Sequence, residues 1–168
     1  YELIEKEGGE VVTSGLLDFF LYCAMDSTYR AKHLDGTWLS GFAGSLAREA
    51  LELYRLPYAQ AVKKSKRFDH VERMTDVAKV ASNYIDLGNQ CGEGWFLTGD
   101  MIDLIEKGAK QIVCLQPFGC LPNHVSGKGM VKTLSAAYPD VRIAAIDYDP
   151  GSSAVNQANR LKLLLATM

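Results

Sequence analysis

The sequence lacks both an excess of positive charge and a long apolar run. Its 168 residues include 18 Lys and Arg against 20 Asp and Glu, so nothing in the net charge of −2 favours nucleic acid or an anionic membrane. No apolar run approaches the roughly 20 residues that span a bilayer, and the opening residues lack the layout of a signal peptide. The basic run Lys63–Arg67 is interpreted as a solvated face. We expect a cytoplasmic protein that binds neither nucleic acid nor membranes.

Complete nucleotide-binding motifs are missing as well. The pair Gly92 and Gly94 is not followed by a glycine at the spacing of the dinucleotide fingerprint. Gly127-Lys128-Gly129 resembles the end of a P-loop, but Pro122 stands where that motif needs its first glycine, and no Ser or Thr follows Lys128. ATP binding by this chain is therefore not expected.

The size and composition suit one folded domain. An apolar fraction of 48% fills a core, and 23% charged residues cover a surface. We expect residues 1–168 to form a single domain, and because the chain opens at Tyr1 we expect it to be a fragment of a longer chain.

Periodic patterns predict mainly helices in the first half and alternating helices and strands in the second. A short strand is expected at residues 10–13. Helices are expected at 16–25, at about 40–55, from Pro57 onward, and at 72–84, 96–107, 124–138 and 154–165. The residue before a proline disfavours helix, so the second of these is expected to end before Pro57.

Two almost wholly apolar segments, 110–115 and 141–146, are expected to be buried strands. The order strand, helix, strand, helix predicts parallel strands joined by right-handed crossovers. The expected fold class is α/β, a three-layer parallel sheet with helices on both faces, flavodoxin-like or Rossmann-like.

Cys120 is the main candidate for chemistry. It lies between Pro117 and Pro122 in the loop after the first apolar strand, and ligands gather beyond the carboxyl ends of parallel strands. A thiol near a helix N-terminus has its thiolate stabilised, and a thiolate binds iron or attacks a carbonyl. The alternative interpretation is a small packing residue in a tight turn.

The other cysteines give weaker signals. Cys91, in the glycine-rich segment 88–95, comes one helix and one strand before Cys120, so the two could share a site at one edge of the sheet. A structural loop thiol is the equal alternative. Cys114, in an apolar strand, and Cys23, in an apolar helix, are interpreted as structural.

Three further polar residues lie close to these loops. Asp147 and Asp149 flank a tyrosine at a strand end, where they hold a cation or a ribose hydroxyl, or only shape the turn. His124, near the candidate loop, is interpreted as a helix-start residue, with a role as acid, base or ligand as the alternative.

Three motifs together resemble a known family. The segments 92–99 (Gly-Glu-Gly-Trp-Phe-Leu-Thr-Gly), 116–124 (Gln-Pro-Phe-Gly-Cys-Leu-Pro-Asn-His) and 146–151 (Ile-Asp-Tyr-Asp-Pro-Gly) look like the C-terminal part of large acyl-CoA dehydratase activase-related proteins. That part is in turn similar to the components of 2-hydroxyacyl-CoA dehydratases. The resemblance covers most of the chain and is sharpest from about Gly88 to Leu165.

The resemblance implies an iron–sulfur cluster, of the 4Fe–4S type, and one-electron chemistry on an acyl-CoA thioester driven by an ATP-hydrolysing activase. It implies that Cys120 is a cluster and metal ligand, with Cys91 as a second ligand. It also implies that the remaining ligands lie in upstream domains of the same chain, so that the cluster is incomplete in this fragment and the fragment alone is inactive. The implied partners are those upstream domains and an acyl-CoA substrate or a dehydratase protein.

Two other hypotheses stay open. The chain is a non-catalytic docking domain of a large activase, in which the cysteine loop is structural, or it is a cysteine-nucleophile enzyme that pairs Cys120 with His124.

Overall fold

The computed structural model describes residues 1–65 and 71–166, and the chain divides into two compact units. The first unit comprises Tyr1–Thr13 and Asp100–Met168, and the second comprises Ser14–Gly99. Lys66 and Arg67 of the basic run lie outside the described residues. The single domain expected over residues 1–168 stays a prediction.

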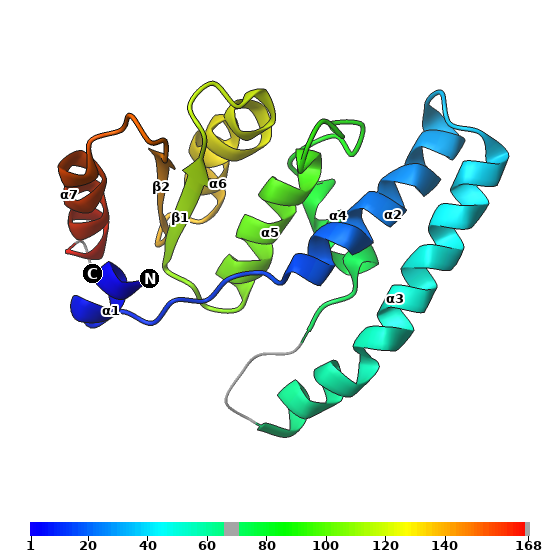
Figure 1. Cartoon of the computed structure of the whole chain (residues 1–168), viewed down its shortest axis with the longest axis horizontal. Coiled ribbons are helices and arrows are strands. Elements are labelled where there is room, and N and C mark those ends of the chain that lie inside the picture. The colour runs from blue at the N-terminus through cyan, green and yellow to red at the C-terminus, as the bar shows by residue number, and fades with distance from the viewer. Residues whose placement is uncertain (66–70, 167–168) are drawn as a thin grey trace. The chain divides into compact units, whose positions relative to one another are not determined.

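The second unit is built on a helical hairpin. Helices α2 (Leu16–His33) and α3 (Trp38–Ser65) lie side by side (Figure 1). The close approach requires small residues, because a Cβ added at Gly44 would stand 2.6 Å from the carbonyl oxygen of Ala24. A contact of 3.2 Å between the hydroxyls of Thr28 and Ser45 joins the same two helices.

Two shorter helical pieces complete the core of this unit. Helix α4 (Met74–Ala81) has a strongly one-sided apolar pattern, and α5 (Gly94–Glu106) contributes its first turns. Tyr22 and Trp95 are 1% exposed, and their rings meet edge to face at 5.2 Å. Large aromatic side chains therefore fill the centre of the second unit.

The expectation that the helix at about 40–55 ends before Pro57 is wrong. The helix runs through Pro57 to Ser65. A proline in a helix removes the hydrogen bond to the carbonyl four residues earlier, here that of Leu53. Because Pro57 is exposed and Leu53 is 65% exposed, this part of the helix lies on the solvent side, where water can replace the lost donor.

The first unit holds the only sheet among the described residues. Strands β1 (Gln111–Gln116) and β2 (Arg142–Asp147) pair in parallel, with Cys114 opposite Ala145, as the two apolar segments predicted. Helix α7 (Ala154–Leu165) packs on both strands, α6 (Val131–Ala137) packs on β2, and α1 (Glu2–Lys6) packs on α7. Between β1 and α6 lie a π-helical turn η1 (Asn123–Gly127) and a 3₁₀ turn η2 (Lys128–Met130).

The expected three-layer parallel sheet, flavodoxin-like or Rossmann-like, is wrong. The described residues form two strands only, in a chain that is mostly helix. Residues 10–13, expected to be a strand, are irregular. An apolar pattern identified β1 and β2 correctly, but a multi-stranded sheet needs further apolar segments of strand length, and the first half of the chain uses its apolar residues in helices.

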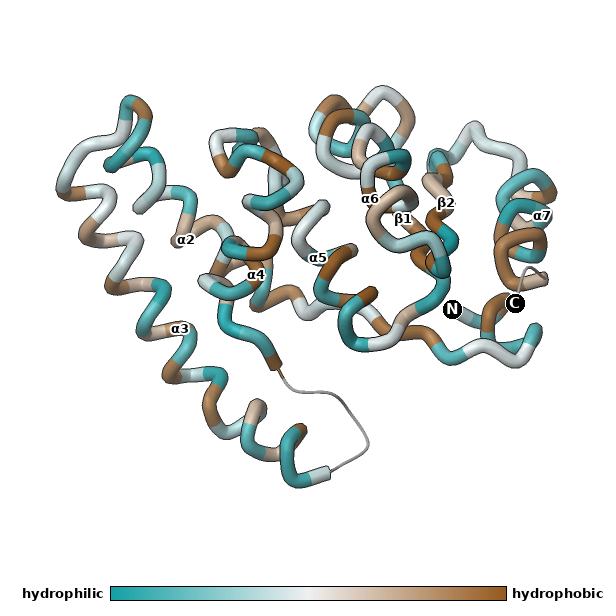
Figure 2. The backbone as a smooth tube through the Cα atoms, turned by 180° about the vertical axis from the view of Figure 1, so that it is seen from behind, coloured by the Kyte–Doolittle hydropathy of each residue, from teal (hydrophilic) through white to brown (hydrophobic). Residues whose placement is uncertain are grey.

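The outer edge of β2 is open. A groove of about 650 Å³ runs along it between α6 and α7, with Ile143, Ala144 and Ala145 along its floor. Figure 2 shows the mixture of apolar and polar residues along these elements. Within residues 1–65 and 71–166, no helix combines the length and the apolar character needed to cross a membrane.

Candidate functional site

The loop after β1 is a tight turn that leads directly into a helical segment. The N–H of Cys120 donates to the carbonyl of Pro117 at 3.2 Å, and Gly119 has a φ of +70°. A positive φ at the third residue of such a turn is typical of type II and favours glycine. The N–H of His124 then donates to the carbonyl of Cys120 at 3.0 Å. Cys120 thus lies beyond the carboxyl end of β1, at the start of the helical segment, and is half-buried.

The side chain of Asn123 points at the sulfur of Cys120. Its Nδ2 donates to Sγ at 3.1 Å, and Asn123 itself is only 5% exposed. The spacing of three residues places both side chains on one face of the helical turn. A π-helical turn begins at Asn123, and such turns are rare and frequent at functional sites. Sequence reasoning missed this donor, although its spacing from Cys120 was a usable signal.

The two aspartates after β2 join the loops that follow the two strands. Both carboxylate oxygens of Asp149 accept from the backbone N–H of Phe118 at 2.9 Å. Oδ1 of Asp147 accepts from Nε2 of Gln116 at 2.6 Å. These bonds support the interpretation that the aspartates shape the loops, with the added finding that they hold the Cys120 loop from the neighbouring strand.

Gln116, the last residue of β1, is 1% exposed. Its Oε1 is a buried acceptor without a hydrogen-bond partner among the residues that the structure describes. A buried acceptor left unpaired costs roughly 1–3 kcal/mol, so native proteins seldom leave one without a reason.

His124 does not contact the sulfur of Cys120 through any hydrogen bond among the described residues. Its Nδ1 lies 2.8 Å from the carbonyl oxygen of Cys120. A carbonyl only accepts, so Nδ1 is the protonated nitrogen in this contact. A cysteine–histidine dyad requires a hydrogen bond to the thiol, and this contact is therefore that of a helix-start residue.

Cys91 is exposed on the glycine-rich turn before α5, in the second unit, whereas Cys120 belongs to the first. Two bonds fix the Cys91 turn. The hydroxyl of Tyr22 donates to the carbonyl of Gly92 at 3.1 Å, and the N–H of Trp95 donates to the carbonyl of Asn89 at 2.7 Å. The sulfur of Cys91 is thus presented outward from a turn anchored on the aromatic core.

A half-buried carboxyl, that of Asp26, is bonded to the residue that follows the Cys91 turn and was not singled out from the sequence. Nε1 of Trp95 donates to Oδ1 of Asp26 at 3.1 Å. Burial raises the pKa of Asp26 to about 6, although hydrogen bonds from Tyr22 and Trp95 act in the opposite direction. Burial likewise raises the pKa of the Tyr22 phenol, and the charge of Asp26 adds to that rise.

The remaining two cysteines differ in environment. Cys114 is buried in β1, where burial and the nearby charge of Asp100 raise the pKa of its thiol. This agrees with a structural role. Cys23 lies exposed on α2 instead of being enclosed in an apolar helix.

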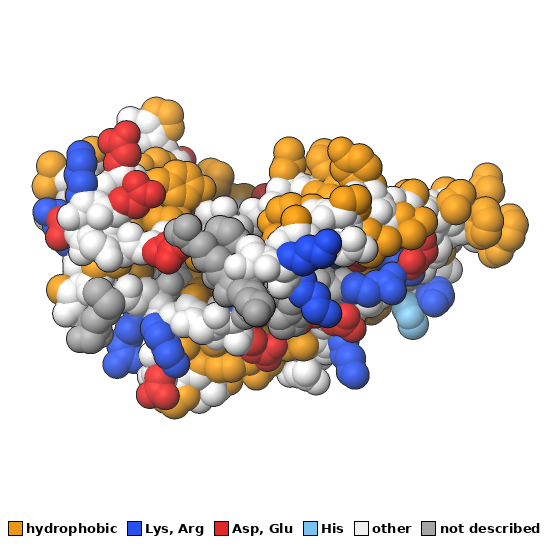
Figure 3. Space-filling view, turned by 90° about the horizontal axis from the view of Figure 1, so that it is seen from below, with side chains coloured by type: hydrophobic (Ala, Val, Ile, Leu, Met, Phe, Trp, Pro, Cys, Tyr) orange, Lys and Arg blue, Asp and Glu red, His pale blue; other side chains and the backbone are white. Residues whose placement is uncertain are grey.

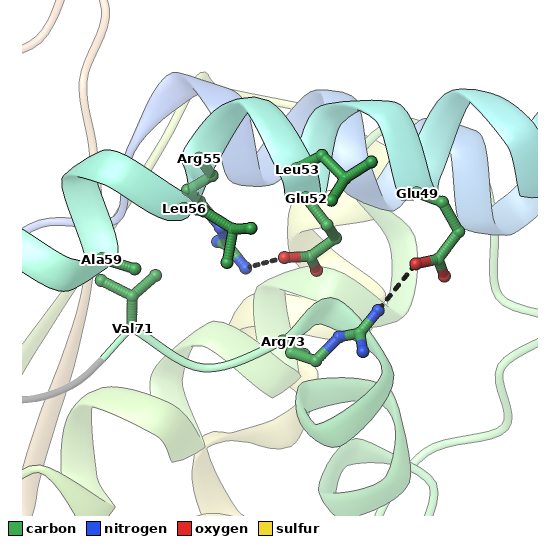
Figure 4. Close-up of a pocket in the computed structure, with 8 residues that line it drawn as sticks. All are labelled: Glu49, Glu52, Leu53, Arg55, Leu56, Ala59, Val71 and Arg73. Carbon is green, nitrogen blue, oxygen red and sulfur yellow. Dashed lines mark hydrogen bonds and ion pairs between the residues drawn. The ribbon is translucent and has the colours of Figure 1, made fainter.

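A charged cluster beside α3 surrounds a pocket of about 270 Å³ (Figure 4). Arg55 is 5% exposed and pairs with Asp18 at 2.5 Å and with Glu52 at 2.8 Å. At the pocket mouth, Arg73 pairs with Glu49 at 3.0 Å. The arginine and carboxylate charges of this cluster neutralise one another within the second unit. We therefore interpret the cluster as ion pairs that hold α3 in place, not as a binding site for a charged ligand.

No group of three or more His, Cys, Asp or Glu side chains within residues 1–65 and 71–166 is placed to hold a metal ion. Comparison with known protein families, with curated proteins and with solved structures found no match to this chain.

Proposed function

We propose that the chain is the cluster-side domain of a cytoplasmic iron–sulfur protein related to the 2-hydroxyacyl-CoA dehydratases and their activases. Its proposed task is to supply the thiolate of Cys120 to a 4Fe–4S cluster, in a system that performs ATP-driven one-electron chemistry on acyl-CoA thioesters. Cys91 is proposed as a second ligand.

The observation that most supports the proposal is the pair formed by Cys120 and Asn123. A packing cysteine is enclosed by apolar side chains, whereas the half-buried sulfur of Cys120 receives an N–H from a buried amide. Hydrogen bonds to cysteine sulfur are one of the means by which proteins set the potential of an iron–sulfur cluster. The surroundings of Cys120 therefore fit one corner of such a cluster.

The described residues do not supply a full ligand set, because no group of three or more His, Cys, Asp or Glu side chains among them is placed to hold a metal ion. The proposal therefore requires the remaining thiolates to come from upstream domains or from a dehydratase partner. When bound, the cluster would supply the one-electron step. The chain's own residues fix the ligand: Asp149 holds the backbone at Phe118, and Asn123 orients the sulfur.

The loop also offers a buried acceptor. Oε1 of Gln116 lies at the strand end from which the Cys120 loop departs, without a described partner. A hydroxyl or amide N–H of a substrate is the kind of donor that satisfies it.

The test is iron and sulfide analysis of the protein at its natural length, purified without oxygen. We expect iron and sulfide in the parent protein, a large loss of both in Cys120→Ser, and no loss in Cys23→Ser, which replaces an exposed helical cysteine as the matched control. Asn123→Ala should keep the iron but shift the reduction potential to a more negative value. Equal iron in Cys120→Ser and Cys23→Ser would contradict the proposal.

A further inference from the structure

Helix α3 presents an apolar face to solvent, opposite the face that packs on α2. We call it the α3 outer face and define it by five side chains that are 48% to 65% exposed: Leu39, Phe42, Leu46, Leu53 and Leu56. Figure 3 shows hydrophobic side chains at the molecular surface, interspersed with charged ones. Together with Trp38, the exposed parts of these side chains amount to roughly 700 Å² of apolar surface, more than a monomer usually shows in one patch.

The outer face carries little charge, although Arg73 pairs with Glu49 there and, with Val71, borders the pocket that Leu53 and Leu56 also line. Between Trp38 and Gln60 the only charged residues of the helix are Arg48, Glu49, Glu52 and Arg55. Each of them forms an ion pair within its own unit. Of the four, only Glu49 falls on the outer face. A helix surface that faces water normally carries solvated charges, so this surface is built for contact with another apolar surface.

The spacing of the outer face is symmetrical. With Glu49 included, its positions are 39, 42, 46, 49, 53 and 56, and the intervals of three, four, three, four and three residues are the same in both directions. Alternating intervals of three and four form the heptad seam along which two helices pack. This spacing suits a pair formed with the same helix of a second copy, and both the parallel and the antiparallel pair have twofold symmetry.

We propose that the α3 outer face is the interface of a homodimer in which α3 packs antiparallel against α3 of a second copy. Leu39 then lies opposite the partner's Leu56, Phe42 opposite the partner's Leu53, and Leu46 opposite the partner's Glu49. The roughly 700 Å² that each copy contributes is close to the roughly 800 Å² per partner of a standard-sized interface.

Glu49 selects the orientation of the two helices. In a parallel pair with the same register, Glu49 would stand directly opposite the partner's Glu49, and like charges in one layer repel. In the antiparallel pair each Glu49 faces a leucine of the partner. Its carboxylate is neutralised by the guanidinium groups of Arg48 and Arg73 of its own chain, each of which has a nitrogen 3.0 Å from a carboxylate oxygen. The two Glu49 side chains, one in each of the two central layers, also fix the register, because any shift would place each Glu49 against a different layer.

The first test is the mass of the protein at its natural length in solution as a function of concentration, by light scattering or sedimentation equilibrium. We expect a dimer at micromolar concentration, and a dissociation constant at least about thirtyfold higher for Leu53→Glu. Leu163→Glu is the matched control, because Leu163 is 69% exposed on α7, in the other unit. Circular dichroism of each variant establishes that it is folded. A monomer at all concentrations, or a dimer that Leu53→Glu leaves unchanged, would overturn the proposal.

The second test concerns orientation. A mixture of a Leu39→Cys chain and a size-tagged Leu56→Cys chain should form the mixed disulfide under mild oxidation. Each variant alone should form little covalent dimer. The parent chain, which has four native cysteines, is the control and should also form little. Covalent dimers of Leu39→Cys alone, above the level of the parent chain, would show a parallel pair and overturn the antiparallel interface.

Discussion

The buried Arg55 gives a sharp prediction about stability. The substitution Arg55→Met keeps an apolar stem of similar length but removes the cation that faces Asp18 and Glu52, and it removes a donor to the carbonyl of Glu72 at 2.7 Å. Breaking a buried pair from one side typically costs about 3–5 kcal/mol, because the remaining charge stays buried without a counter-ion. The side chains of Asp18 and Glu52 are 26% and 12% exposed, so water reaches them in part. We therefore expect the lower end, about 3 kcal/mol.

The measurement is urea unfolding followed by circular dichroism, with Arg73→Met as the control. The pair of Arg73 and Glu49 borders the same pocket, but its side chains are 54% and 50% exposed, so water screens the pair and its loss should destabilise the fold far less than the loss of Arg55. High salt should reduce the effect of Arg73→Met and leave most of the effect of Arg55→Met. If the two substitutions cost the same, within about 1 kcal/mol, the role assigned to the buried cation is wrong.

Two further predictions concern the cysteine turns. Because the folded-state pKa of Asp26 is raised from 3.8 to about 6, the folded state binds more protons than the unfolded state between these values, and stability should fall as the pH rises from about 4 to 6. The fluorescence of Trp95 should change with a midpoint near pH 6, and Asp26→Asn should abolish both effects; a midpoint near 4 would contradict the burial of this carboxyl. Asp149→Ala should release the loop after β1, so that Cys120 reacts several times faster with a thiol reagent, while Asp149→Asn keeps one acceptor and should show a smaller rise. Unchanged reactivity in Asp149→Ala would mean that the tether does not position the loop.

The sequence predicted local structure better than it predicted architecture. The parallel pairing of β1 with β2 followed from two apolar segments separated by a helix, and the position of Cys120 followed from the prolines around it. Pro57 was misread because the rule about prolines treats all faces of a helix alike. An exposed proline interrupts a hydrogen bond that water can replace, whereas a buried one cannot be compensated in this way.

At the candidate site, the cysteines were found from the sequence and their partners were not. The hydrogen bond from Asn123 to the sulfur of Cys120 depends on a π-helical turn, and the bond from Phe118 to Asp149 joins residues 31 positions apart. The raised pKa of Asp26 depends on burial against Trp95, 69 positions away. Contacts of this range follow from the packed fold and leave no local pattern in the sequence.

The wrong fold class and the proposed dimer both relate to apolar residues that are not buried within the chain. Apolar runs were taken to mean burial within the chain, and β2 and α3 are two of the elements where that assumption fails. Ile143, Ala144 and Ala145 lie along an open groove although parallel strands are normally covered on both faces, and Leu46 and Leu53 are more than half exposed on a helix without outward charge. The described residues bury only part of the apolar side chains. For α3 the alternating intervals of three and four residues indicate packing against a second helix, which is why the proposed interface can be tested residue by residue.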